Sequence, residues 1–290
     1  MIYLLQSLIT LLIGIGCASG IPQNPALKPI MLLPRELDEC SGMVSLGNEL
    51  YAGLNDSGNA AELYIFSLKP GQKTKVVTIL GASNDDWEEL AADHIYMYIG
   101  DTGNNDGNRK NLRIYRIKKN DLLNQTEVQA ELISFHYPEQ KLIQPSNHHN
   151  FDCEALVAVG DSLYLFTKNR GDSQTDLYSI PAVPGKYAAR HLDRFDADGL
   201  VTGADYRQKD GSGELILIGY TIEGKGYHPF IIYFPQVSDT GFFKGSSERF
   251  TFSGRLQTET ILFHDEHTVF VSNEEEHGDK GFIYQVDIRK

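Results

Sequence analysis

The chain repeats one pattern five times, and this repetition limits the folds open to it more than any other feature. Each repeat contains an apolar residue followed by tyrosine within a short apolar run. A second apolar run lies upstream, across a polar and mostly glycine-rich turn. The five pairs are Leu63-Tyr64, Ile114-Tyr115, Leu177-Tyr178, Ile232-Tyr233 and Ile283-Tyr284. Short apolar runs separated by turn residues are typical of β-strands, so the repeat predicts an all-β protein.

Further strand candidates complete each repeat. In the first unit, residues 41–44 precede the two apolar runs and residues 75–80 follow them. Four short strands per unit predict a five-bladed β-propeller with four-stranded antiparallel blades. The fifth unit ends at Lys290 without its fourth strand, and residues 29–33 could supply it and close the ring. Six blades would result if residues 117–150 contain one more, and a β-sandwich is the main alternative.

The N-terminal residues predict that the chain is exported from the cytoplasm. Residues 1–16 are largely apolar and carry no charged side chain, which favours a signal peptide over residues 1–20. Cleavage after Ala18-Ser19-Gly20 would release the chain, whereas Cys17 could instead carry a lipid, and a retained anchor is the third alternative. Residues 21–28 are expected to be a tether, and 29–290 a single propeller domain. We therefore expect a periplasmic, extracellular or outer-membrane-anchored bacterial protein without a transmembrane span in its mature chain.

The net charge limits the kinds of molecule that the protein can bind, and the positions of the cysteines bear on disulfide formation. Lys and Arg number 26 against 39 Asp and Glu, a net charge of −13. Such a charge opposes binding to nucleic acid and to anionic lipid surfaces. We expect a monomer that binds a small molecule or an envelope protein. Cys40 and Cys153 fall in different, non-adjacent blades of the predicted propeller. We expect two free, buried thiols, because a disulfide needs Cα atoms within about 7 Å.

One position recurs on the first strand of every predicted blade, the strand that lines a propeller's channel. The residues at this position are Ser41, Glu88, Glu154, Thr202 and Glu259. Three carboxylates would thus converge at one mouth, with Ser41 and Asp205 beside them as ligand-binding candidates. Converging carboxylates repel one another, and a bound cation, a hydrogen-bond network or a catalytic pair with split pKa values would relieve the repulsion.

Calcium is the cofactor that this oxygen-rich set favours. We predict Glu88, Glu154 and Glu259 as its ligands. Asp101 and Asp106 are added because the turn of residues 101–108 nearly matches a calcium loop. A tight turn that needs Gly and Asn for positive φ explains the same residues equally well.

The chain contains no recognisable catalytic motif. G-x-S-x-G, a Walker loop and a dinucleotide fingerprint are all missing from the sequence. Arg109 and Lys168 could bind an anionic group at the mouth. His148 and His149 precede the third blade and are candidate general bases, with Glu154 as a further catalytic candidate.

Several motifs resemble uncharacterised secreted bacterial propeller proteins. They include Gly100-Asp101-Thr102-Gly103 and Asp152-Cys153-Glu154. Glu39-Cys40-Ser41, Asn55-Asp56-Ser57 and Asp86-Trp87-Glu88 are similar to motifs of the SdiA-regulated propeller proteins of the cell envelope. The resemblance implies a calcium-binding propeller in the periplasm or outside the cell, and it implies no reaction.

Three functions follow as hypotheses. The first is an envelope propeller that binds calcium and a ligand at the channel without turnover. The second is a metal-dependent hydrolase of an ester, lactone or phosphoester, in which the cation would activate a water molecule. The third is a scaffold that binds another envelope protein. Whether the protein is an enzyme stays open at this point.

Overall fold

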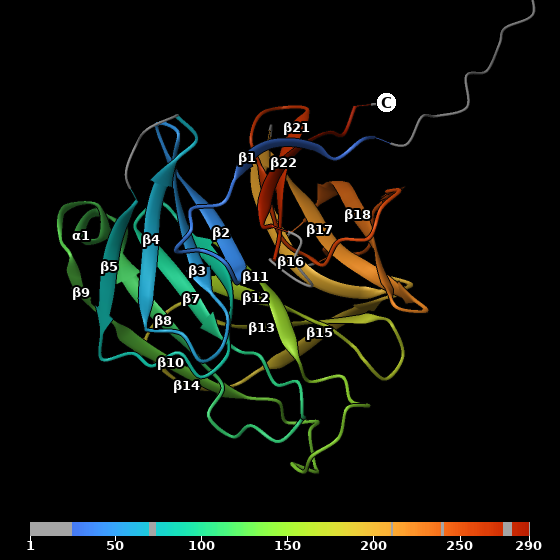
Figure 1. Ribbon diagram of the computed structural model, residues 1–290. Helices are drawn as coiled ribbons and strands as arrows, with labels where there is room; N and C mark the ends of the chain where they lie inside the picture. Colours follow the sequence, from blue (N-terminus) through green and yellow to red (C-terminus); the bar gives the residue numbers. More distant parts are fainter. Residues whose placement is uncertain (1–24, 70–73, 210, 239–240, 275–279, 290) are drawn as a thin grey trace, which may run out of the picture.

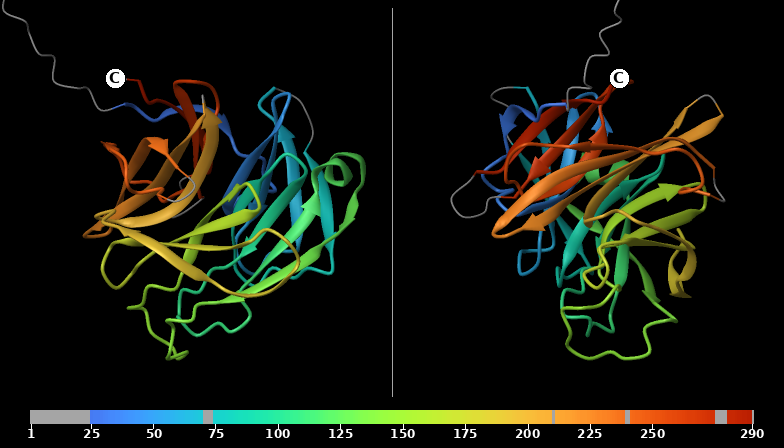
Figure 2. Two further views of the ribbon diagram at one scale, coloured as in Figure 1. Left: turned by 180° about the vertical axis from the view of Figure 1, so that it is seen from behind. Right: turned by 90° about the vertical axis from the view of Figure 1, so that its right-hand side faces the viewer.

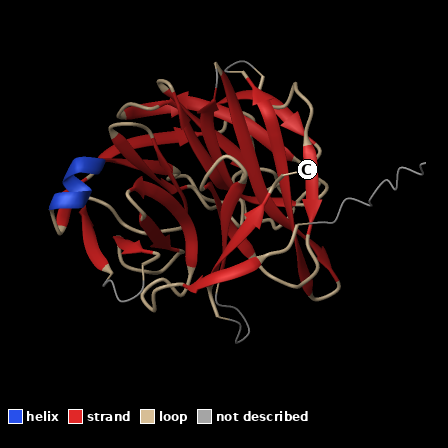
Figure 3. Ribbon diagram, turned by 90° about the horizontal axis from the view of Figure 1, so that it is seen from above, coloured by secondary structure: helices blue, strands red, loops and turns tan. Residues whose placement is uncertain are grey.

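Five β-sheets are arranged in a ring (Figures 1 and 3), which confirms the predicted all-β, five-bladed β-propeller. The computed structural model describes residues 25–69, 74–209, 211–238, 241–274 and 280–289. The predicted signal peptide and most of the tether lie outside these residues. In the described part of the chain, no helix is long and apolar enough to cross a membrane.

The strands follow the repeat in order. Blade 1 contains β2 (Cys40–Gly47), β3 (Leu50–Asn55), β4 (Glu62–Ser67) and β5 (Lys75–Leu80). Blade 2 contains β6 (Trp87–Ala92), β7 (Tyr96–Asp101), β8 (Arg113–Lys118) and β10 (Glu131–His136). Blade 3 contains β11 (Cys153–Val159), β12 (Ser162–Thr167), β13 (Thr175–Pro181) and β15 (Arg190–Phe195). Blade 4 contains β16 (Leu200–Lys209), β17 (Ser212–Glu223), β18 (Gly226–Val237) and β19 (Glu248–Thr251).

Blade 5 joins the two ends of the described chain. It contains β20 (Thr258–Phe263), β21 (Thr268–Asn273) and β22 (Phe282–Asp287), and β1 (Lys28–Leu32) adds the fourth strand. β1 runs antiparallel to β22, with Lys28 opposite Gln285. The blue and red ends of the ribbon consequently lie side by side in both views of Figure 2. The predicted closure is confirmed, although the strand begins one residue earlier than expected.

Two blades gain a fifth strand that the repeat did not predict. β9 (Glu127–Gln129) pairs in parallel with β5 of blade 1, and β14 (Gly185–Ala188) pairs in parallel with β10 of blade 2. Each comes from the repeat that follows, so neighbouring blades are tied together and an outer edge is covered. The described residues of 117–150 form β9, β10, the short helix α1 (Lys119–Asn124) and loops, so no sixth blade is present there.

Apolar side chains fill the spaces between neighbouring sheets. Five clusters occur, one for each pair of adjacent blades. Trp87, for example, is fully buried between blades 1 and 2, with its ring centroid 6.1 Å from that of Tyr115. Cys40 and Cys153 belong to different clusters, and both thiols are free and buried, as predicted.

Every inner strand contains a β-bulge at the same position. The pairing skips one residue between positions 40 and 42, 87 and 89, 153 and 155, 201 and 203, and 258 and 260. The skipped residues are the five aligned ones, Ser41, Glu88, Glu154, Thr202 and Glu259. Because a bulge re-aims side chains and often lies next to a functional site, this regularity directs attention to the channel end where the inner strands begin. We call this end the polar mouth.

A glycine follows the bulged residue Thr202, where β16 packs closely against β20. A Cβ on Gly203 would lie 2.5 Å from the carbonyl oxygen of Glu259 and 3.1 Å from the Cα of Thr260. Gly203→Ala should therefore lower the free energy of unfolding by about 1–3 kcal/mol through overpacking. Urea unfolding checks this, with Ser212→Ala on the same blade as a control that should change little. An unchanged midpoint for Gly203→Ala would show that the inner strands can separate freely.

Candidate functional site

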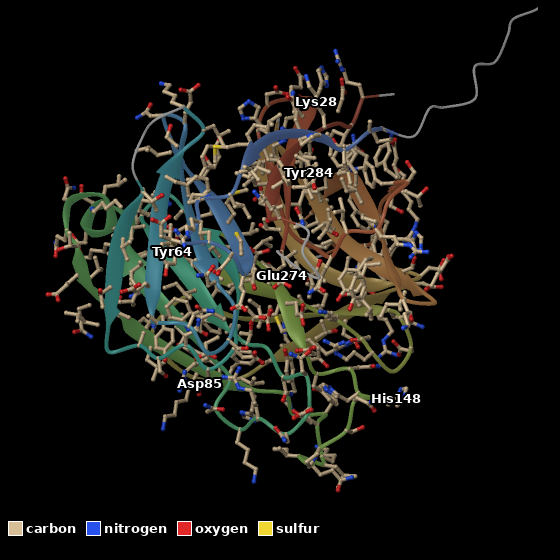
Figure 4. All side chains as sticks on the ribbon, viewed as in Figure 1. Lys28, Tyr64, Asp85, His148, Glu274 and Tyr284 are labelled. Carbon is tan, nitrogen blue, oxygen red and sulfur yellow. The ribbon has the colours of Figure 1, made fainter. Side chains whose placement is uncertain are left out.

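Three carboxyl groups meet at the polar mouth. Glu88 comes from the bulge of β6, Asp86 from the loop just before it, and Asp56 from the loop after β3. One oxygen from each lies within 4.8 Å of the others. The label of Asp85 in Figure 4 marks the loop that carries Asp86. We call these three residues the carboxylate triad.

The triad is buried and short of positive charge. Glu88 is only 6% exposed. Burial raises its pKa well above the usual range, and the nearby charges of Glu154, Asp56 and Asp86 raise it further. Burial, and then the charge of Asp56, raises the pKa of Asp86 to about 7. None of the described Lys, Arg or His side chains forms an ion pair with Asp56 or Glu88, and the Arg109 guanidinium is 3.9 Å from Asp86. A bound cation would relieve this repulsion.

The glycine-rich turn after β7 supplies space rather than ligands. A Cβ on Gly103 would overlap Glu88 Oε1 and approach Asp86 Oδ2 to 2.5 Å, so only glycine fits beside the triad. The carboxylate of Asp101 is fully buried and bonded to Arg109 at 2.7 Å and Arg113 at 2.8 Å.

The turn therefore corrects three sequence-based assignments. Asp101 is held by two guanidinium groups, and Asp106 is exposed, so neither joins the triad. Arg109 donates to Asp101 and to the carbonyl of Gly103 at 2.6 Å, which leaves it little freedom to bind an anionic ligand.

Across the mouth, Glu154 pairs with Lys168. The Lys168 ammonium lies 2.6 Å from Glu154 Oε2 and 5.4 Å from the centre of the Tyr220 ring. Arg170 bonds to Asp152 at 3.2 Å and lies 3.7 Å from Glu154. Burial raises the pKa of Glu154 to about 8, although the positive charges of Lys168 and Arg170 act in the opposite direction. These contacts occupy Glu154 and Lys168 with each other rather than with an ion or an anion.

The remaining bulge residues are buried as well. Glu259 is 4% exposed, and burial, together with the charge of Glu274, raises its pKa well above the usual range. The Thr202 hydroxyl donates to the carbonyl of Thr258 at 2.6 Å, and the Ser41 hydroxyl donates to that of Glu39 at 3.5 Å. Glu88, Glu154 and Glu259 thus reach the same mouth, but the structure pairs Glu88 with Asp56 and Asp86 instead.

Asp205 lies toward the other end of the channel. It accepts hydrogen bonds from the backbone N–H groups of Tyr206 and Phe263, both at 2.8 Å, and lines a small cavity of about 40 Å³. Burial raises its pKa to about 6. The prediction that Asp205 stands beside the channel carboxylates is therefore wrong, because a strand residue three positions beyond the bulge is carried along the channel.

Glu89 obstructs the channel, a role that sequence reasoning missed. Its carboxyl group accepts hydrogen bonds from the N–H of Leu90 at 2.9 Å and from that of Ala204 at 3.3 Å. Ala204 belongs to blade 4, which is not adjacent to blade 2, so this side chain reaches across the channel. Burial raises its pKa well above the usual range. A ligand would consequently enter the polar mouth from one side only.

The two adjacent histidines lie away from the triad. His149 Nδ1 accepts from the N–H of Phe151, and its Nε2 is 3.1 Å from the carbonyl of Asn105, so both ring nitrogens are engaged. His148 is exposed on the loop between β10 and β11, as Figure 4 shows. Both line a separate groove over blade 3. The structure does not bring either of them to Glu154 as a general base.

Comparisons with known proteins give a likeness in structure alone. No protein-family model matches the chain, and no curated protein matches it. Among solved structures, the chain is similar to the catalytic domain of a GH62 α-L-arabinofuranosidase from Coprinopsis cinerea. The TM-score is 0.49 at 12% identity, over 91% of this chain and 96% of that one. Nothing about the activity of this chain follows from that likeness.

Proposed function

We propose that this protein is a cell-envelope or secreted propeller that binds a calcium ion at its polar mouth and uses the ion to hold a ligand there. Asp56, Asp86 and Glu88 would supply protein ligands to the ion. The observation that carries this proposal is the carboxylate triad itself. Its oxygens lie within 4.8 Å of one another, and Glu88 is buried without an ion pair among the described residues.

The donor set favours calcium over softer metals. All three ligands are carboxylate oxygens, and calcium takes about six to eight oxygens in flexible geometry. Asp56 comes from a loop of blade 1, while Asp86 and Glu88 flank the start of blade 2. Carbonyl groups, water and oxygen atoms of the ligand would fill the remaining positions. The ligand would thus complete the coordination of the ion, which makes its binding depend on calcium.

Removing one charge from the triad provides the test. For the wild-type chain, calcium at about 100 times its Kd should raise Tm by about 5 °C. In Glu88→Gln this rise should disappear, while the Tm in chelator should exceed that of the wild type because the repulsion is relieved. Glu131→Gln is the matched control, since Glu131 is half-exposed and pairs with Arg116 away from the mouth. Melting curves in calcium and in EDTA decide the matter, and equal Tm values for the wild type in both conditions would refute the calcium site.

Hydrolysis is the second candidate, and one observation favours it. The pKa values of Asp86 and Glu154 are raised to about 7 and about 8, so both lie near neutral pH, where general acids and bases work best. A calcium ion beside them would polarise a carbonyl or phosphoryl oxygen. Turnover of p-nitrophenyl acetate, a simple lactone or p-nitrophenyl phosphate that requires calcium and is lost in Glu154→Gln would establish this reaction. Binding without turnover of any of the three supports the first function.

A further inference from the structure

A second cavity lies outside the polar mouth. It is a groove of about 610 Å³ over blade 3, between the loop that precedes β11 and the loop that joins β12 to β13. Its volume falls in the range of small-ligand sites, about 300–1,000 Å³. Its wall includes His148, Phe151, Tyr178, His191 and Arg194. The groove shares no lining residue with the carboxylate triad.

A tyrosine in the wall of the groove has a hydroxyl group that no described residue occupies. Tyr178 is 2% exposed, and its hydroxyl forms no hydrogen bond within the described part of the chain. The charges that act on this phenol are those of Asp176, Glu139 and Arg194, all of which line the groove. The Tyr178 hydroxyl is not one of the fully enclosed polar atoms that lack a partner, so it is open to the groove and free to bond to a ligand there.

The surrounding side chains are held in place. Asp176 accepts from His191 Nε2 at 2.7 Å, from Arg194 Nε at 2.7 Å and from Asn169 at 2.9 Å. Asn150 is oriented by the N–H of Gly171 at 3.2 Å and by Asp172 at 2.7 Å. Such a network fixes donors and acceptors before a ligand arrives and reduces the entropy lost on binding.

The charges in the groove are mixed. Glu139, Asp172 and Asp176 outnumber Arg194, and the chain carries a net charge of −13, so an anion is disfavoured. A metal ion is disfavoured as well, because the metal-ligand group found among the described residues is the carboxylate triad and not a set in this groove. A neutral ligand with many hydroxyl groups suits planar donors and acceptors placed beside aromatic rings.

We propose that this groove binds a neutral oligosaccharide. Sugar hydroxyls would bond to the Tyr178 hydroxyl, to the outer edge of Arg194 and to the carboxylates of Glu139 and Asp172. The apolar face of a sugar ring would pack on Phe151. The site is separate from the calcium site, so it functions whether or not calcium is bound.

Removing one oxygen atom tests the proposal. Titration of the full-length protein with maltotetraose, cellotetraose, xylotetraose and chitotetraose, followed by saturation-transfer NMR, should reveal binding of at least one of them. Tyr178→Phe should weaken that binding about fivefold or more, the loss of one hydrogen bond. Its Tm should not fall, because the hydroxyl has no partner in the protein and the ring keeps its contacts with Tyr137 and His191.

Two controls separate this site from the polar mouth. Tyr96→Phe removes a hydroxyl from β7 of blade 2, which does not line the groove, and it should leave sugar binding unchanged. EDTA should also leave it unchanged, so loss of the calcium site and loss of the sugar site are distinguishable. Failure of all four sugars to bind, an unaltered affinity in Tyr178→Phe, or displacement of the sugar by inorganic phosphate would each overturn the proposal.

Discussion

Lys168→Met should lower the free energy of unfolding by about 3–5 kcal/mol at pH 8.5, because Glu154 would then be buried without its cationic partner, either as a lone charge or by taking up a proton at a pH far above its ordinary pKa. The loss is large compared with a total stability of about 5–15 kcal/mol. Lys168 and Glu154 are both nearly fully buried and their charged atoms are 2.6 Å apart. Urea unfolding at fixed pH measures the effect.

The effect should depend on pH in a defined direction. The pKa of Glu154 is raised in the folded state to about 8 from its ordinary value of 4.5. Between these two pH values the folded chain therefore holds a proton that the unfolded chain has lost. The contribution of this group to stability is therefore fully present below pH 4.5 and is lost as pH rises through 8. Without Lys168 the pKa of Glu154 rises further, so the variant continues to lose stability at pH values where the wild type no longer does. The difference in the free energy of unfolding between the wild type and Lys168→Met should thus increase from about pH 6 to about pH 9.

A double variant isolates the buried charge. Lys168→Met with Glu154→Gln should recover much of the lost stability and should show no such pH dependence. Lys69→Met is the surface control, since Lys69 and Glu49 form an ion pair in which both side chains are more than half exposed. That change should cost about 0–1 kcal/mol. A pH-independent loss in Lys168→Met would mean that packing, rather than the charge of Glu154, is what Lys168 provides.

Gly103→Ala should abolish saturable calcium binding while the propeller remains folded. The new methyl group would occupy the space of Glu88 Oε1 and approach Asp86 Oδ2, so the triad could not keep its spacing. No charge changes, which separates this variant from Glu88→Gln. Isothermal titration with calcium measures the binding, and unfolding in EDTA reports the fold.

A neighbouring substitution in the same turn serves as the control. Asn108 is exposed, and Asn108→Ala should keep calcium affinity unchanged. Wild-type affinity in Gly103→Ala would argue that the triad is not the ion site, whereas loss of affinity in both variants would indicate that the whole turn had rearranged.

The architecture was predictable because the repeat acts locally. Alternating apolar runs and turns specify strands, and five units in order specify a ring, so the blades and even the closing strand β1 could be placed. The parallel strands β9 and β14 could not, because each is three or four residues long and pairs with a neighbouring blade. Their existence depends on how the blades pack and not on any local pattern.

The site was predictable only in part, for a similar reason. Aligning the inner strands located Glu88, Glu154 and Glu259, because they occupy one position in the repeat. The other triad members, Asp56 and Asp86, lie in loops whose paths are set by tertiary contacts. The sequence also did not show which charged side chains form ion pairs with one another. Asp101 looks like an ion ligand until Arg109 and Arg113 are seen to hold it, and Glu89 looks like an ordinary strand residue until the bulge directs it across the channel.

The pairing of β1 with β22 has a consequence for how this chain is made. Lys28 pairs with Gln285, so the ring cannot close until both strands and the blades between them have been synthesised. Until then the edge of blade 5 is open, and exposed edges invite association with other chains. Contacts between residues so distant in sequence also form slowly. For the secreted or cell-envelope protein that we propose, this delay would be useful, because a ring that is still open can be threaded across a membrane.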